Sequence, residues 1–79
     1  MKSLSDISVG ERGKVVRVEG LDGVSIRLLE MGLTPGAAVA VIGTAPLGDP
    51  LELEIRGYRL SVRKSEAARV HVELIPRAD

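Results

Sequence analysis

The chain has 79 residues, enough for one domain, and its eleven basic and eleven acidic residues give a formal net charge of zero. This balance and the single aromatic residue argue against a nucleic-acid-binding protein, which would carry a basic surface and aromatic platforms for bases. The chain has no cysteine and no apolar run near the ~20 residues that span a bilayer, and residues 1–6 lack the apolar region of a signal peptide. Disulfides, thiolate metal sites and direct membrane insertion are therefore not expected, and the expected location is the cytoplasm.

The first quarter of the sequence predicts an arm, a turn, a strand and a loop. Leu4 and Ile7 are the apolar residues that would pin the arm to the end of a barrel. Residues 10–13 are predicted to form a turn because glycines flank a charged pair. The β-branched run over 14–19 predicts a strand, and the Gly-Leu-Asp-Gly loop after it offers Asp22, or the glycine that follows, as a helix cap.

Residues 24–31 carry a helical period. Val24, Leu28 and Met31 recur at i, i+4 and i+7 and would share one helix face. Gly32 suits the left-handed C′ position of a Schellman cap, in which the leucine after it contacts Leu28. The Thr-Pro-Gly-Ala sequence that comes next predicts a type II turn, because proline presets φ and glycine accepts a positive φ.

The second half of the sequence predicts four short strands. Residues 38–42 are apolar on both faces, as in a central strand, and the two prolines over 45–50 predict a rigid, shaped loop. Residues 51–55 and 58–63 alternate between apolar and polar side chains and would be joined by a two-residue hairpin turn at Arg56-Gly57.

The end of the sequence predicts one helical turn with Ser65 as its N-cap, followed by a last strand. This strand, over 70–74, would turn its two valines and Leu74 inward, and residues 76–79 would fray. Five strands, tight turns and one short inserted helix predict an all-β fold, a small closed barrel of SH3-like type that forms a single domain over residues 1–79.

The sequence contains no recognisable set of catalytic residues. The glycine–lysine loop of nucleotide-binding proteins is missing. His71 is the single histidine; on a strand beside Glu73 it is expected to be solvated, and it lacks the further ligands of a metal site. Ser61, His71 and Asp49 could form a triad only on paper, because no nucleophile elbow surrounds the serine. The sequence therefore predicts a binding or regulatory module that is not an enzyme and has no cofactor and no metal site.

Two apolar residues of the predicted helix lie away from the stripe formed by Val24, Leu28 and Met31. At about 100° per residue, Ile26 and Leu29 fall on another side, and a two-turn helix on a small barrel has little room to bury both sides. One interpretation is a wide apolar face that plugs the barrel. The other is a docking surface for a partner protein. The docking hypothesis includes helix residues and two residues of the rigid loop as their neighbours: Ile26, Leu28, Leu29, Met31, Pro46 and Leu47.

Three segments together resemble the FeoA family, small cytoplasmic proteins of bacterial ferrous-iron transport. They are RLLEMGLTPG at 27–36, APLGDP at 45–50 and LSVRKSEA at 60–67. The resemblance implies an SH3-like barrel with an inserted helix, no enzymatic activity and no obligatory cofactor. It also implies a role in assisting or regulating FeoB, a membrane iron transporter with a cytoplasmic GTPase domain, at its cytoplasmic face.

The same type of domain also occurs in metal-dependent transcriptional repressors, so a regulatory module of such a repressor is the alternative interpretation. We expect this chain to be a complete domain, which counts against that alternative. A metal chaperone or small enzyme is disfavoured by the single histidine and the lack of cysteine, and we expect ferrous iron to bind weakly. Edge strands and the apolar helix stripe permit a homodimer.

Overall fold

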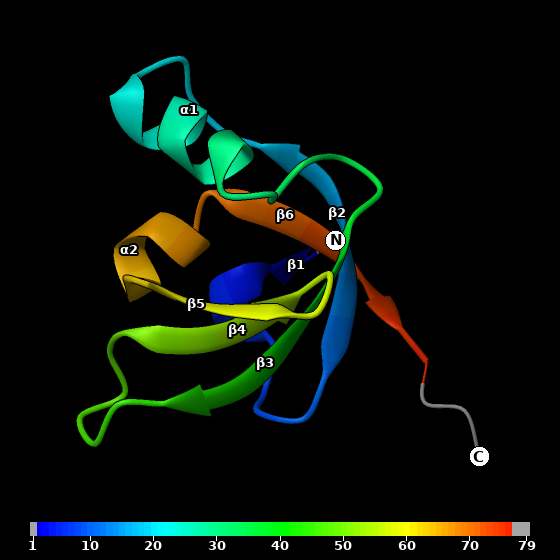
Figure 1. Ribbon diagram of the computed structural model, residues 1–79, viewed down its shortest axis with the longest axis vertical. Coiled ribbons are helices and arrows are strands. Elements are labelled where there is room, and N and C mark those ends of the chain that lie inside the picture. Colours follow the sequence, from blue (N-terminus) through cyan, green and yellow to red (C-terminus); the bar gives the residue numbers. More distant parts are fainter. Residues whose placement is uncertain (1, 77–79) are drawn as a thin grey trace.

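The protein folds around one antiparallel sheet, and the computed structural model describes residues 2–76. The strands are β1 (Lys2–Ser3), β2 (Arg12–Val18), β3 (Ala38–Thr44), β4 (Leu51–Ile55), β5 (Tyr58–Val62) and β6 (Val70–Ile75). They lie in the order β1-β6-β2-β3-β4-β5 (Figure 1). The 3₁₀ helix η1 (Leu4–Asp6) follows β1, α1 (Gly23–Glu30) is inserted between β2 and β3, and α2 (Lys64–Ala67) lies between β5 and β6.

Two irregularities in pairing help the sheet to curl into a barrel. The register shifts between Val15 and Arg17 where β2 pairs with β6, and between Val41 and Gly43 where β3 pairs with β4. Such bulges bend a strand and increase its twist. β1 and β5 are the edge strands, and the helices that follow them, η1 and α2, pack against each other across the gap. The predicted small barrel with one inserted helix is therefore confirmed, and the predicted arm adds a two-residue strand that was not predicted.

The core is aliphatic, as the composition requires. Alternation along β4 turns Leu51, Leu53 and Ile55 inward, and all three are buried, while Glu52 and Glu54 are exposed. The other buried hydrophobic side chains come from strands, helices and turns: Leu4, Ile7, Val15, Leu28, Leu33, Ala37, Val39, Val41, Val62, Ala67, Val70 and Val72. The burial of Leu4 and Ile7 confirms that they hold the N-terminal segment against the barrel.

Two tight turns match their predicted types. The N–H of Ala37 donates to the carbonyl oxygen of Thr34 at 3.0 Å, and Gly36 has a φ of +92°, as a type II turn requires. Arg56 and Gly57 have φ values of 49° and 83°. Two successive positive φ values are the backbone of the type I′ turn, whose twist suits a two-residue hairpin.

The predicted turn over 10–13 is wrong in its second half, because β2 begins at Arg12. Gly13 is a buried strand residue between β3 and β6. A Cβ at this position would lie 2.9 Å from the Cβ of Val72 and 3.0 Å from its Cγ2. The glycine thus permits a close approach of β6, and this long-range role has no local signature in the sequence. The strand over 51–55 has its predicted ends, and the remaining strand ends agree with the predicted ones to within two residues.

The Gly13→Ala variant is expected to lower the free energy of unfolding by about 1–2 kcal/mol, because a β-branched side chain and two paired strands must shift to admit the methyl group. The matched control is Gly43→Ala, also on a strand, where an added Cβ would meet only the Cβ of Glu52 at 3.9 Å. Urea denaturation of both variants measures the difference. Equal stabilities would show that Val72 can give way.

The last strand differs from its prediction at Leu74, which is 39% exposed rather than inward. Within residues 2–76, the β6 residues that pair with β1 are His71 and Val72. No β1 residue therefore flanks Leu74 on that side, and its side chain lies beyond the end of the core. The predicted fraying over 76–79 falls, except for Pro76, on residues outside the described part of the chain.

The N-cap prediction for the second helix is also wrong. α2 begins at Lys64, so Ser65 lies inside the helix and the N-cap is Arg63. The carboxylate of Glu66 accepts the backbone N–H of Arg63 at 3.3 Å, which stabilises a start before Ser65.

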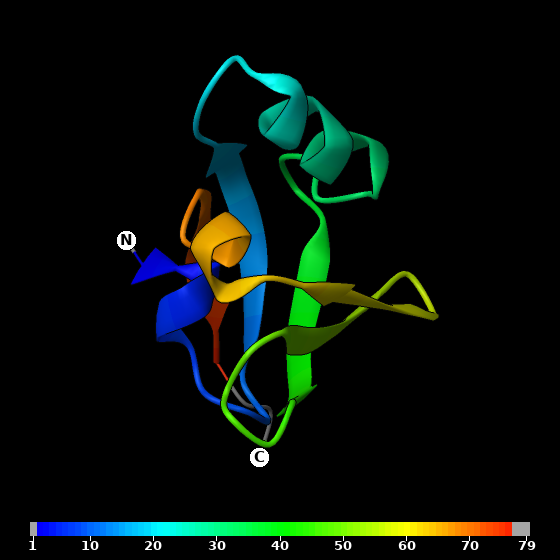
Figure 2. The same ribbon diagram turned by 90° about the vertical axis from the view of Figure 1, so that its left-hand side faces the viewer.

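The inserted helix and the β3–β4 loop lie at opposite ends of the molecule, and both views show this separation (Figures 1 and 2). α1 extends beyond one end of the barrel, where β2 leaves the sheet and β3 enters it. Residues 45–50 form the far end, between β3 and β4. Within residues 2–76, every helix is too short or too polar to cross a membrane.

Candidate docking surface on the inserted helix

The helix α1 begins at a side-chain cap. Oδ1 of Asp22 accepts the backbone N–H of Ser25 at 3.1 Å, and the Ser25 hydroxyl donates to the carbonyl oxygen of Asp22 at 2.8 Å. The prediction of Asp22 as the cap is confirmed. Arg69, from the segment before β6, donates to the same carboxylate oxygen at 2.7 Å. The start of α1 is therefore tied to the barrel by an ion pair.

The Arg69 hydrogen bond, followed by the Ser25 N–H, lowers the pKa of Asp22 from 3.8 to about 2. Because the pKa is depressed in the folded state, the contribution of this group to stability is present above pH 3.8 and is lost as the pH falls through about 2. We expect the stability advantage of the wild type over Asp22→Asn to shrink across this window. Unfolding curves of both proteins at matched pH values test this, and a constant difference would contradict it.

The helix ends in the predicted Schellman motif. The N–H of Gly32 donates to the carbonyl oxygen of Leu29 at 3.0 Å, and the N–H of Leu33 donates to that of Leu28 at 3.2 Å. Gly32 has a φ of +106°. The hydroxyl of Tyr58 donates to the carbonyl oxygen of the C-cap residue, which joins this end of the helix to β5.

The predicted inner stripe of the helix faces the barrel. Leu28 is fully buried, and Val24 and Met31 are partly buried against the core. The structure therefore corrects the hypothesis that Leu28 is a partner contact, because a fully buried side chain cannot touch another protein while the domain stays folded. The same geometry makes Met31 mainly a packing residue.

The outer face of the helix is apolar and exposed. Ile26 is 53% exposed and Leu29 is 38% exposed, and residues three apart are neighbours on a helix surface. Leu21 immediately precedes the cap and is fully exposed. In a hydrophobic staple, a residue at this position packs on the fourth helical residue, here Ile26. The exposure of Leu21 shows that this contact is open. We call Leu21, Ile26 and Leu29 the α1 face.

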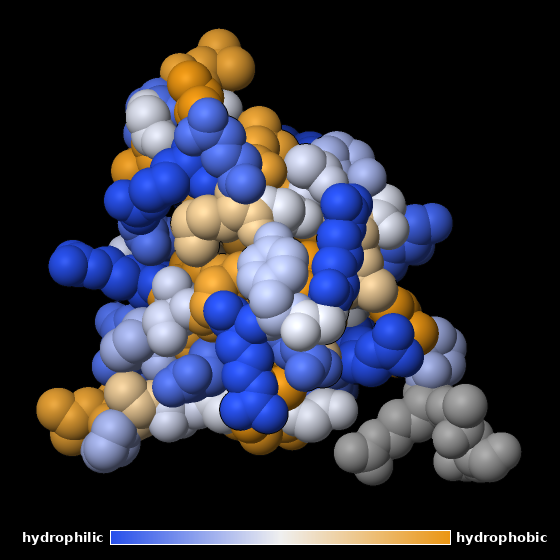
Figure 3. Space-filling view, in the orientation of Figure 1, coloured by the Kyte–Doolittle hydropathy of each residue, from blue (hydrophilic) through white to orange (hydrophobic). Residues whose placement is uncertain are grey.

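Leu21 was not predicted to belong to this surface, because it lies in a glycine-containing loop of the sequence. The signal that could have found it is the staple spacing, with one apolar residue before the cap and another at the fourth helical position. Figure 3 shows a hydrophobic tip at the top of the molecule, over the α1 end, and a second one at the lower left, over the β3–β4 loop. Mixed and mostly hydrophilic surface separates them.

Some of the charged side chains near the α1 face have an ion-pair partner within the described residues, and one does not. Arg27 forms an ion pair with Glu66 of α2, and Arg69 forms one with Asp22. Glu30 is exposed and takes part in no salt bridge within residues 2–76. Arg27 and Arg69 are therefore paired within the chain, while the carboxylate of Glu30 has no ion-pair partner among residues 2–76.

Pro46 and Leu47 are not neighbours of the helix, contrary to the prediction. They lie at the tip of the β3–β4 loop, where Leu47 is 97% exposed. The loop is shaped, as predicted, by internal hydrogen bonds: the N–H of Gly48 donates to the carbonyl oxygen of Ala45 at 2.7 Å. The carboxylate of Asp49 also accepts the backbone N–H of Lys64 at 2.9 Å. A single small docking site cannot include this tip together with the α1 face.

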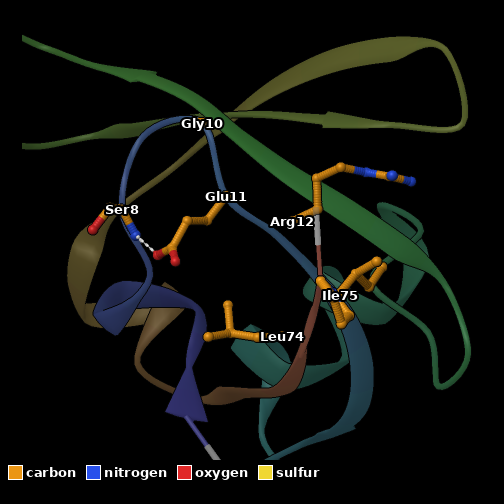
Figure 4. A pocket seen from close by; sticks show the side chains of 7 residues that line it. Ser8, Gly10, Glu11, Arg12, Leu74 and Ile75 are labelled. Carbon is orange, nitrogen blue, oxygen red and sulfur yellow. Dashed lines mark hydrogen bonds between the residues drawn. The ribbon is translucent and has the colours of Figure 1, made fainter. Parts of the chain in front are cut away.

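A hollow of about 800 Å³ lies between the segment before β2 and the end of β6 (Figure 4). Glu11 lines this hollow, and its carboxylate accepts a hydrogen bond from the backbone N–H of Ser8 at 2.7 Å. The side chain of Arg12 points away from Glu11, and Leu74 contributes an apolar wall. The one acid that lines the hollow thus serves the local turn, and no acid–base pair converges there among the described residues.

The histidine also has a structural partner. Nε2 of His71 lies 2.9 Å from Oε1 of Glu19, and the histidine side chain is only 20% exposed, which corrects the expectation of a solvated side chain. Within residues 2–76, no group of three or more histidine, cysteine, aspartate or glutamate side chains lies close enough together to hold a metal ion. Weak binding of ferrous iron stays a prediction.

Comparison with known proteins finds relatives that share this fold, some of similar length and some much longer. The chain is 42% identical over 72 residues to the Fe(2+) transport protein A/Fe(2+) transporter FeoB fusion protein of Porphyromonas gingivalis. The matched segment covers 91% of this chain but only 8% of the length of that relative. The structure of a FeoA-like protein from Clostridium acetobutylicum is 33% identical, with a TM-score of 0.90, and the match covers 99% of this chain and 91% of that one.

A third relative is the FeoA of Stenotrophomonas maltophilia complexed with zinc, described as a prokaryotic SH3 domain protein. It is 31% identical, with a TM-score of 0.83 over 92% of this chain and 91% of that chain. A manganese-dependent transcriptional repressor contains a similar fold, but at 16% identity this likeness shows the fold alone. The family model described as the FeoA domain matches residues 2–74. Its match covers most of the chain, which therefore belongs to the FeoA family.

Proposed function

We propose that this protein is a non-enzymatic, cytoplasmic accessory protein of ferrous-iron uptake, which docks through the α1 face onto the cytoplasmic GTPase-containing part of a FeoB-type transporter. The observation that carries the proposal is the open staple: Leu21 and Ile26 occupy positions that pack together in many helices, yet both are exposed here. Exposed apolar side chains that are grouped on one element mark interaction surfaces.

The relative in which one chain contains both a FeoA and a FeoB part supports the choice of partner. Joining two modules in one chain raises their effective concentration, which favours a contact that is weak between separate proteins. In this proposal iron is the cargo of the transporter, and the accessory protein acts by contact. In this proposal the contact is made by Ile26, Leu29 and Leu21, and the inner stripe of α1 holds the helix against the barrel.

The test is a calorimetric titration of this protein against the cytoplasmic domain of the FeoB-type transporter from the same genome, with and without guanine nucleotide. Ile26→Gln and Leu29→Gln are expected to weaken binding at least tenfold, because truncation or polar replacement of a contact at the centre of an interface costs more than ~1.4 kcal/mol. Both variants should stay folded, since the two side chains are already exposed to water.

The chain offers a matched control for each variant. Ile42 on β3 is 36% exposed and Leu74 on β6 is 39% exposed, so Ile42→Gln and Leu74→Gln repeat the same chemistry away from α1. Leu47→Gln tests the opposite end of the molecule. If Leu47→Gln or a control weakens binding while the α1 variants do not, the docking surface lies elsewhere. If the wild type shows no binding in either nucleotide state, the proposal fails.

A further inference from the structure

We infer that the surface that receives the α1 face is an apolar groove with a lysine or arginine side chain at its rim, positioned to meet Glu30. The inference rests on the proposed function, because it describes the chemistry of the same partner. Within residues 2–76, Glu30 has no ion-pair partner, and it lies beside the apolar α1 face.

Glu30 belongs to the α1 face by position. It lies four residues after Ile26 and one after Leu29, and residues four apart are neighbours on a helix surface. All three side chains are exposed. A partner that covers Ile26 would therefore also cover, or closely border, the carboxylate of Glu30.

The stability of the helix does not account for this carboxylate. Glu30 is the last residue of α1, where the helix dipole presents its negative end, so an acidic side chain there is unfavourable. The basic residue of the last turn, Arg27, is engaged with Glu66 instead. Glu30 forms no salt bridge within residues 2–76 that would offset the cost. In the isolated domain, this side chain is thus a mild liability.

A partner that buried the α1 face without a cation would have to strip water from Glu30 and leave the charge unpaired, which opposes binding. A partner with a cation at the rim of its groove removes this penalty and attracts the domain during diffusional encounter. A neutral or acidic rim would be rejected by the same carboxylate. The free charge therefore selects the partner, while the apolar side chains supply the contact area.

The experiment measures association and dissociation rates with the FeoB-type cytoplasmic domain at low and high salt. Glu30→Lys is expected to lower the association rate at least tenfold at low salt, and Glu30→Gln is expected to flatten the salt dependence. Glu30→Gln should also raise the melting temperature of the free domain slightly, because it removes an unfavourable charge from the helix end. Glu52→Gln, an exposed change of the same kind on β4, should leave the rates unchanged.

The outcomes separate this inference from the proposed function. If Ile26→Gln weakens binding but both Glu30 variants bind as the wild type does at every salt concentration, docking through the α1 face stands and the cationic rim is overturned. If Glu52→Gln changes the rates as much as Glu30→Gln, the effect is general charge and the specific pairing is overturned. If the wild type does not bind the transporter domain, both proposals fall.

Discussion

The Leu28→Gln variant is expected to lose about 3–5 kcal/mol of stability. Leu28 is fully buried in the inner stripe of α1. The change therefore removes core packing and buries a polar amide among apolar side chains. For a domain of this size, each kcal/mol lowers the melting temperature by about 4–8 °C. The expected decrease in melting temperature is therefore at least about 12 °C, measured by circular dichroism during heating.

Ile26→Gln is the control for this prediction, because it makes a comparable change on the same helix at a side chain that is 53% exposed. Its melting temperature should stay close to that of the wild type. Any loss of partner binding in Leu28→Gln should follow the loss of folded protein, whereas Ile26→Gln should lose binding while folded. A stable, folded Leu28→Gln variant would show that α1 can leave the barrel without cost to the core.

The Gly32→Ala variant is expected to lose about 2–4 kcal/mol, through two separable effects. The first is backbone strain, because Gly32 has a φ of +106°, which side chains other than glycine rarely adopt. The second is a collision, because a Cβ at this position would meet the Tyr58 hydroxyl and would lie 3.6 Å from the Cζ of that ring. Denaturation in urea measures the sum.

Two further variants separate the two effects. Gly36→Ala also introduces a methyl group at a positive φ, +92°, but no atom lies within 4 Å of the added Cβ, so it reports backbone strain alone. Tyr58→Phe removes the hydroxyl with which the methyl group collides. In that background the excess cost of Gly32→Ala over Gly36→Ala should decrease, as a double-mutant cycle would show. An unchanged excess would place the collision elsewhere.

The features that could be predicted from sequence are those whose causes are local. The cap at Asp22, the Schellman motif at Gly32 and the hairpin turn at Arg56-Gly57 depend on residues within a few positions of one another, and all three are present. The alternation in β4 is equally local, because the period of a strand decides which side chains face the core.

The features that were mispredicted depend on residues that are distant in sequence. Gly13 resembles a turn glycine until β6, almost sixty positions later, is packed against it. Leu74 fits the apolar–polar alternation of its strand, but the two residues of β1 pair with His71 and Val72 and do not extend along β6 as far as Leu74. The prediction that Leu47 neighbours the helix was wrong for the same reason. Leu47 and the outer residues of α1 are all apolar and exposed, but the fold places them at opposite ends of the molecule.

The strand order has a consequence for how the chain is synthesised. β6 lies between β1 and β2 in the sheet and pairs with both, so the first and second strands have the last strand as their shared neighbour. While the chain is still emerging from the ribosome, β2 has β3 beside it, but β1 has no strand to join until Val70–Ile75 are made. Contacts between such distant segments also slow folding, because a long loop must close first. The barrel is therefore completed only when nearly all of the domain has left the exit tunnel. A chain that stops before Val70 leaves β1 without a partner strand and β2 with one unpaired edge.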